Sequence, residues 1–160
     1  MIVVSDASPL VTLARIGRLE LLAVLYGRVI VPEAVWQEIT GVSTEKAGVV
    51  DLRNASWLEH RTVKDLAAVE SLRLQLDRGE SEAVVLSLEL GADLLLMDER
   101  AGREAAQRKG LRVIGLLGLL SEAKQRRIIG LLAPVLEELR QADFRMSVEL
   151  AGRVLRQAGE

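Results

Sequence analysis

The sequence contains no cysteine and a single histidine, His60. A chain without cysteine cannot form disulfides, use a thiol nucleophile or build a cysteine zinc finger, and one histidine is too few for a histidine-rich zinc site within one chain. Aromatic residues make up only 2 %, so a platform that stacks the bases of single-stranded nucleic acid is not expected. Any chemistry must therefore depend mainly on carboxylates, hydroxyls and basic side chains.

Long apolar runs and an excess of positive charge are also missing. No uncharged apolar run reaches the roughly eighteen residues that a membrane span requires, and the first apolar stretch lacks the preceding basic region of a signal peptide. These features predict a cytoplasmic protein without a membrane partner. The net charge is -2 and the pI about 5.6, so binding to nucleic acid would need a local basic patch.

Short apolar segments predict the strands. Each is rich in Val, Ile or Leu without polar alternation, which is typical of strands buried on both faces of a parallel sheet. They are "IVVS" at 2–5, "RVIVP" at 28–32, "DLLLM" at 93–97 and "LRVIG" at 111–115, with "WLEHRTV" at 57–63 as a marginal fifth.

Helical patterns alternate with these strands, and this alternation predicts an α/β fold in which a parallel sheet of four or five short strands lies between helices. Residues 42–56 are weakly patterned and are interpreted as mostly loop. We expect a single domain, 1–160, with an α/β core over 1–115 and a helical extension over 116–160. The predicted helices cover 7–27 with a break at Gly17, 32–41, 64–91 with a break near Gly79, 99–110, 116–125, 130–142 and 147–158.

Two aspartates follow predicted strands. Asp6 comes directly after the first strand, and Asp98 follows "DLLLM". Ligands of open parallel sheets bind beyond the carboxyl ends of the strands, so these two side chains are expected at one site. Asp93 lies at the opposite end of its strand and is interpreted as an ordinary surface residue.

Two helices carry glutamates in unusual places. On a helical wheel at about 100° per residue, Glu38 falls in the middle of the apolar arc of its helix, where a carboxylate is costly unless it is paired or binds a metal. Glu80 falls on the interior side of the next such helix, whereas Glu82 falls on a narrow edge that solvent can reach. We therefore expect Glu38 and Glu80 to join the two aspartates.

Each acid also has an ordinary explanation. Asp98 could cap the helix that follows it, Glu80 could favour a helix amino terminus through the helix dipole, and Asp6 could form a turn before Ser8. An arginine such as Arg15 or Arg28 could neutralise Glu38. The hypothesis of a shared site depends on the four acids together.

A cluster of carboxylates favours a particular class of cofactor. The carboxylates repel one another, which raises their pKa values unless a cation offsets the charge. Oxygen ligands without cysteine or histidine suit Mg²⁺ or Mn²⁺. Such ions serve phosphodiester chemistry, because they polarise phosphoryl oxygens and activate water.

The segments "VVSDASPL", "PEAVWQEI" and "GESEAVVLSLELGADLLLMDERAGR" together resemble the PIN-domain proteins, especially a VapC-like branch. The resemblance is close over residues 1–115, and the later helices are similar to the carboxy-terminal extension of that branch. It implies a small three-layer α/β/α fold and a metal-dependent endoribonuclease, in many members the toxin of a toxin–antitoxin pair that a cognate antitoxin blocks.

The resemblance also assigns residues. The family's four acids, which hold the Mg²⁺ or Mn²⁺ ion and catalyse the reaction, map onto Asp6, Glu38, Glu80 and Asp98, with Glu82 as the alternative third acid. The small hydroxyl residue after the first acid maps onto Ser8. The third position is commonly aspartate in the wider family and is glutamate here. The longer glutamate side chain can still reach a metal ion from a helix, but it changes the geometry of the site.

Basic residues after the last acid could hold RNA by its phosphates. Arg100 and Arg103 lie nearest Asp98 in the sequence and are the preferred candidates. Arg108 and Lys109 are better explained as part of a solvated helix face, where the negative charge of Glu104 weakens the basic patch. Arg112 belongs to the same basic stretch.

The sequence thus leaves two functions open. The first is a Mg²⁺- or Mn²⁺-dependent endoribonuclease that acts on RNA, with an antitoxin protein as partner. The second is a PIN-like binding or scaffold protein that acts through dimerisation or a protein partner, a reading that the acidic pI favours. The apolar carboxy-terminal helices predict a homodimer in either case.

Overall fold

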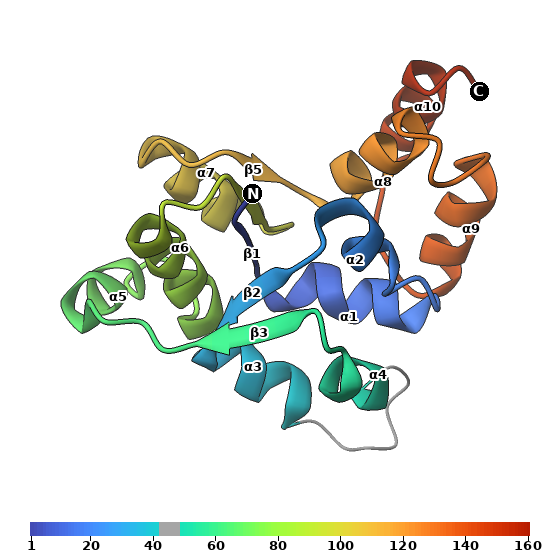
Figure 1. Cartoon of the computed structure of the whole chain (residues 1–160). Helices are drawn as coiled ribbons and strands as arrows, with labels where there is room; N and C mark the ends of the chain where they lie inside the picture. Colours follow the sequence, from blue (N-terminus) through green and yellow to red (C-terminus); the bar gives the residue numbers. More distant parts are fainter. Residues whose placement is uncertain (42–48) are drawn as a thin grey trace.

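The computed structural model describes residues 1–41 and 49–160 (Figure 1). Five strands form one sheet in the order β3-β2-β1-β4-β5, and all neighbouring pairs are parallel. The predicted α/β fold is confirmed, and the marginal fifth strand is the edge strand β3. The strands are β1 (Val3–Ser5), β2 (Val29–Pro32), β3 (Leu58–Arg61), β4 (Leu94–Leu96) and β5 (Val113–Ile114).

The strand order defines where the site lies. From the central β1 the chain moves outward through β2 to β3, then returns to the other side of β1 to form β4 and β5. The point between β1 and β4, where the direction of winding reverses, is where open α/β sheets bind their ligands. Val3 pairs with Leu94 and Ser5 with Leu96, so the residues that follow these two strands emerge side by side.

Ten helices are described. Gly17, at φ 70°, separates α1 from α2, as predicted. Residues 42–56 are predicted to be mostly loop, but the short helix α4 covers most of the part that the structure describes; residues 42–48 lie outside the described residues. The helices are α1 (Ala7–Arg15), α2 (Leu21–Tyr26), α3 (Glu33–Thr40), α4 (Val49–Asn54), α5 (Leu66–Leu72), α6 (Arg78–Leu90), α7 (Arg100–Arg108), α8 (Leu116–Gln125), α9 (Ala133–Gln141) and α10 (Val148–Gln157).

The two faces of the sheet carry separate hydrophobic clusters. On one face Val4 and Leu95 pack against α5, α6 and α7, and on the other Val3 and Leu96 pack against α1, α2 and α3. The helices of the carboxy-terminal segment join the second of these clusters, through residues such as Leu119, and lie together in Figure 1. The molecule therefore has three layers, helices, sheet and helices. None of the described helices is long and apolar enough to cross a bilayer.

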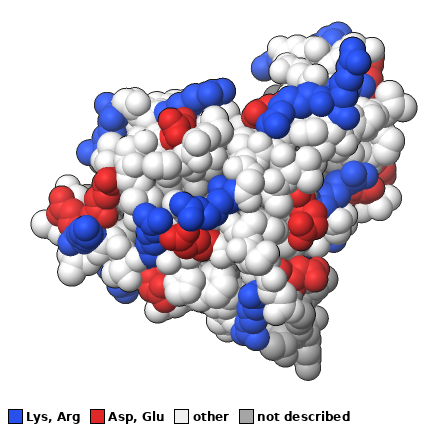
Figure 2. Space-filling view, viewed as in Figure 1, with Lys and Arg blue, Asp and Glu red and all other residues white. Residues whose placement is uncertain are grey.

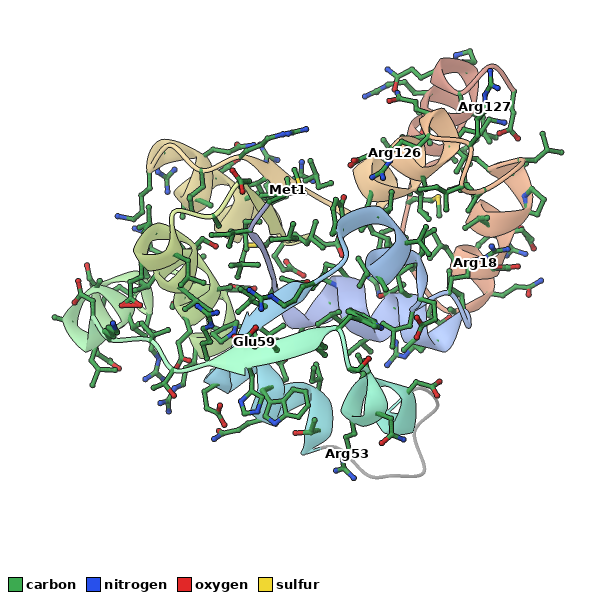
Figure 3. All side chains as sticks on the ribbon, in the orientation of Figure 1. Met1, Arg18, Arg53, Glu59, Arg126 and Arg127 are labelled. Carbon is green, nitrogen blue, oxygen red and sulfur yellow. The ribbon has the colours of Figure 1, made fainter. Side chains whose placement is uncertain are left out.

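Polar contacts fasten the carboxy-terminal helices to the amino-terminal ones. Arg18 forms a bidentate ion pair with Glu138, with an Nε–Oε2 distance of 2.7 Å. Arg126 donates to the backbone carbonyl of Leu25 at 2.9 Å. Figure 3 labels Arg18 and Arg126 at these two points of attachment. The segment from α8 onward is thus held against α1 and α2 by ionic and hydrogen-bonded contacts as well as by apolar packing.

Candidate active site

Asp6 lies at the end of β1 and is only 5 % exposed. Its backbone N–H donates to the carbonyl of Leu96 at 2.9 Å, which extends the pairing of β1 with β4 to the site. Burial raises the pKa of the Asp6 carboxyl to about 7, against the opposing hydrogen bond from the Ala7 backbone. The negative charges of Glu80, Asp77 and Glu38 raise this pKa further. Asp6 is therefore the buried centre of a group of acids.

Glu38 lies on α3 at the margin of that group. The prediction of an interior position was wrong, because Glu38 is an exposed residue while Val35 and Ile39 face the core. The Glu38 carboxylate lies at the start of α6 instead of in the core, since a Cβ atom at Gly79 would be 3.0 Å from Glu38 Oε2. Desolvation there, followed by the charge of Asp77, raises the pKa of Glu38. Within the described residues no salt bridge reaches Glu38, and Arg28 pairs with Glu59 instead.

The amino terminus of α6 places Glu80 beside Glu38. Asp77 is the N-cap residue: its side chain accepts from the backbone of Glu80 at 2.8 Å, and Glu80 accepts from the backbone of Asp77 at 3.1 Å. This reciprocal capping box begins the helix at Arg78. The break between the helices is predicted near Gly79, two residues after the N-cap residue Asp77. Glu80 is half-buried, and desolvation together with Asp77, Glu99 and Glu38 raises its pKa.

Asp77 is a member of the group that sequence reasoning missed. The signal was present in "DRGE", the spacing of a capping box before an apolar run. Gly79 lies between the two acids, and a Cβ atom at this position would be 3.0 Å from Glu38 Oε2 and 3.6 Å from Asp77 Oδ1. The glycine therefore leaves room for the Glu38 carboxylate to approach the first turn of α6.

Glu82 has a different position from the one predicted. It is 6 % exposed and not on a solvent-reachable edge. Its carboxylate accepts from the backbone N–H of Ala34 at 3.1 Å and from Arg78 Nε at 3.0 Å. It therefore supports the amino terminus of α3 from the neighbouring helix, and both oxygens already have partners.

Asp98 follows β4 by two residues and is held by two hydrogen bonds. It accepts from the backbone N–H of Leu116 at 2.7 Å and from the Ser8 hydroxyl at 3.3 Å. It does not cap the helix directly after it, whose N-cap residue is Glu99, but the amino terminus of α8. Burial raises the pKa of Asp98, while these hydrogen bonds and the charge of Arg103 lower it.

The four predicted acids therefore lie in two connected parts. Glu38 and Glu80 both raise the pKa of Asp6, Glu38 also raises that of Glu80, and the charge of Asp77 raises the pKa values of all three. Asp98 is linked to them through Ser8, two residues after Asp6, and none of the other three contributes to its pKa. As the side chains stand, no three acids among the described residues form a group ready to hold a metal ion.

The basic residues after Asp98 divide in a similar way. Arg103 lies beside Asp98, since a Cβ at Gly115 would be 2.9 Å from both Arg103 Nη1 and Asp98 Oδ1. Arg100 points outward, with a side chain 92 % exposed, and pairs with Glu104 at 2.9 Å. Arg108 and Lys109 line a separate hollow toward α5. Acidic and basic side chains are interspersed on the face shown in Figure 2, without a broad basic field there.

The donor chemistry of the site fits a divalent cation. All candidate ligands are carboxylate oxygens, the preferred ligands of Mg²⁺ and Mn²⁺. Within the described residues Asp6, Glu38 and Glu80 have no salt bridge to a cationic side chain, and their burial and mutual repulsion raise their pKa values. A cation would relieve this repulsion.

The single parallel sheet of five strands between helices is the α/β fold of a PIN-like domain. The chain belongs to the PIN-domain family DUF3368, whose model matches residues 2–160 and so includes the carboxy-terminal helices. PIN domains are generally nucleases that hydrolyse phosphodiester bonds, and they typically use divalent metals. No curated protein matches the chain.

Proposed function

We propose that this PIN domain is a Mg²⁺- or Mn²⁺-dependent endoribonuclease with Asp6, Glu38, Glu80 and Asp98 as its metal-binding and catalytic acids. The observation that carries the proposal is the buried carboxylate of Asp6 at the switch point of the sheet, where burial, with smaller contributions from the nearby charges of Glu80 and Glu38, raises its pKa to about 7. Buried carboxyl groups with strongly shifted pKa values concentrate at functional sites.

Each residue has a distinct role in this proposal. Asp6 and Asp98 follow neighbouring strands and would bind the ion directly, with Glu38 and Glu80 completing the site. When bound, a divalent ion supplies charge stabilisation at the phosphoryl group and lowers the pKa of water. Glu38 is the acid whose exposed carboxylate can orient the attacking water and accept its proton.

Two further residues position these groups. Ser8 donates to Asp98 and helps to fix the orientation of that carboxylate. Arg103, beside Asp98, is placed to hold a phosphate of the substrate. Arg100 would contribute only if its exposed side chain leaves Glu104 when RNA binds.

The two ends of one strand offer a matched test. Asp98→Asn removes a candidate metal ligand but keeps an oxygen that can accept from Leu116, and Asp93→Asn keeps the acceptor for the Ile2 backbone at the opposite end. We expect Mn²⁺-dependent cleavage of a labelled single-stranded RNA to fall about 100-fold or more in Asp98→Asn and to stay within twofold of wild type in Asp93→Asn. EDTA should stop the wild-type reaction. Equal cleavage by both variants would contradict the assignment.

We further propose that the protein is a cytoplasmic toxin of a toxin–antitoxin pair and forms a homodimer. The sequence resemblance supports the toxin role, and Leu131 and Val148, which are 62 % and 86 % exposed on the carboxy-terminal segment, support a dimer surface. Induced expression should arrest growth, and Asp98→Asn should abolish that arrest. Light scattering of the purified protein should give twice the mass of the chain; a monomer at high concentration would count against the dimer.

A second function is favoured by one observation. Glu80 and Asp98 are both engaged as helix caps, and no three described acids are grouped for metal binding. A PIN-like binding or scaffold protein without catalysis would have this arrangement. Calorimetry with Mn²⁺ separates the two functions, because a scaffold need show no binding that Asp6→Asn removes.

A further inference from the structure

A cleft lies directly beside Asp98, between the α/β core and the carboxy-terminal helices. Its volume is about 340 Å³, at the lower end of small-ligand sites. The junction of β5 and α8 forms one wall, and the turn between α9 and α10 forms the other. The lining residues are Asp98, Arg103, Ile114, Gly115, Leu116, Leu117, Gly118, Phe144, Arg145 and Leu150.

The cleft has a cation on each wall. Arg103 comes from α7 and Arg145 from the turn after α9, more than forty positions later. Within the described residues neither guanidinium forms a salt bridge, whereas eight other arginines each pair with a glutamate. Two guanidinium groups without a salt bridge that line one small cleft are suited to a phosphate, which they can hold by charge-assisted hydrogen bonds.

The same cleft has an apolar part. Phe144 is the only phenylalanine of the chain, and it is partly buried against the core next to Arg145. Leu117 and Leu150 lie on the same lining. An aromatic ring beside an arginine is the combination on which proteins stack an unpaired base. One ring suits one nucleotide, in agreement with the low aromatic content.

Two glycines keep the floor of the cleft open. Gly115 has an ordinary φ of -95°, so the backbone does not require glycine, but a Cβ there would be 2.9 Å from Arg103 Nη1 and Asp98 Oδ1. Gly118 is exposed inside α8, and its Cβ would meet only Ile114, at 3.5 Å. Alanine would suit the helix better. Glycine at both positions leaves space above the first turn of α8.

We infer that this cleft binds one unpaired nucleotide of RNA next to the site of cleavage, with its phosphate between Arg103 and Arg145 and its base against Phe144. The inference rests on the proposed nuclease function and deepens it. It makes single-stranded RNA the substrate, and it gives the carboxy-terminal helices a role in substrate binding in addition to covering the sheet.

Binding should be measured separately from catalysis. The parent is Asp6→Asn in EDTA, and the probe is a short fluorescent single-stranded RNA followed by anisotropy. On this parent, we expect Arg145→Gln, Phe144→Leu and Gly118→Leu each to raise the Kd about 10-fold. Arg127→Gln removes the same charge at the far end of α8, labelled in Figure 3, and Gly118→Ala adds only one methyl group. Both controls should stay within twofold, and a duplex of the same sequence should bind at least 10-fold more weakly.

The outcomes separate this inference from the proposed function. Arg145 is exposed, so Arg145→Gln tests the cleft even if a substitution at Phe144 unfolds the chain. Binding by the cleft variants equal to that of the parent, or no binding by the parent, would overturn the inference, even if the wild-type protein cleaves RNA. Cleft-dependent binding without cleavage by the wild type would support the inference and refute the nuclease function.

Discussion

Asp6→Asn should lower the metal-dependent cleavage of RNA by about 1000-fold, because it removes the buried candidate ligand around which the other acids gather. Asparagine has nearly the same shape as aspartate, so the fold should persist. The assay is cleavage of a labelled single-stranded RNA with Mn²⁺, with Asp93→Asn as the control at the opposite edge of the sheet. Cleavage within tenfold of wild type by a preparation free of other nucleases would refute the central role of Asp6.

The same substitution should stabilise the metal-free protein above pH 7. Burial raises the pKa of Asp6 from 3.8 to about 7 in the folded state, so the folded state binds more protons than the unfolded state between these values. Wild-type stability should therefore fall as the pH rises from about 4 to 7, and Asp6→Asn should remove this loss. The difference has an upper limit of about 4 kcal/mol.

Urea unfolding in EDTA at pH 5 and pH 8 measures this effect. The gain from Asp6→Asn should be larger at pH 8 than at pH 5, and Mn²⁺ should stabilise the wild type but not the variant. An equal or lower stability of Asp6→Asn at pH 8 would show that the Asp6 carboxylate is well compensated in the folded protein. Loss of activity together with a gain in stability is expected only of a functional residue.

Glu82→Ala should destabilise the fold by about 2–3 kcal/mol, because it leaves the backbone N–H of Ala34 and the Arg78 guanidinium without their buried acceptor. The matched substitution is Glu80→Ala, two residues earlier on the same helix. It removes one half of a capping box and should cost only about 1 kcal/mol.

Glu80→Ala should mainly reduce activity, and Glu82→Ala should mainly reduce stability. Glu80→Ala should reduce cleavage about 100-fold, whereas Glu82→Ala should retain cleavage at temperatures where it remains folded. Urea unfolding and the RNA assay on both proteins decide which glutamate is the third acid. If Glu82→Ala were stable and inactive, the assignment would pass from Glu80 to Glu82.

Much of the fold could be predicted because buried parallel strands have a simple signature. The segments "IVVS" and "DLLLM" are apolar on both faces and end at acids, and the structure places both acids beyond neighbouring strands. The helix α4 was missed because six residues span fewer than two turns, too short for a periodic pattern to appear.

The errors at the site have a common cause, which is contact between helices. A helical wheel assumes that one face of a helix meets one core, but Glu38 lies where α3 meets α6, and Glu82 is buried because it reaches the backbone of α3. Asp77 could have been found from its capping spacing. The cleft could not, because Arg103 and Phe144 come from segments that no local pattern connects.

The attachment of α9 to α1 has a consequence for synthesis of the protein. Leu136 and Leu139 belong to the same hydrophobic cluster as Leu10 and Leu13 of α1, and Arg18, shortly after α1, pairs with Glu138, which lies 120 positions later in the chain. While a ribosome is still producing the middle of the chain, α1 can pack against α3 and α4, but Arg18 still lacks its partner on α9. A nascent chain therefore cannot complete its tertiary structure, or the cleft beside Asp98, until α9 has left the exit tunnel.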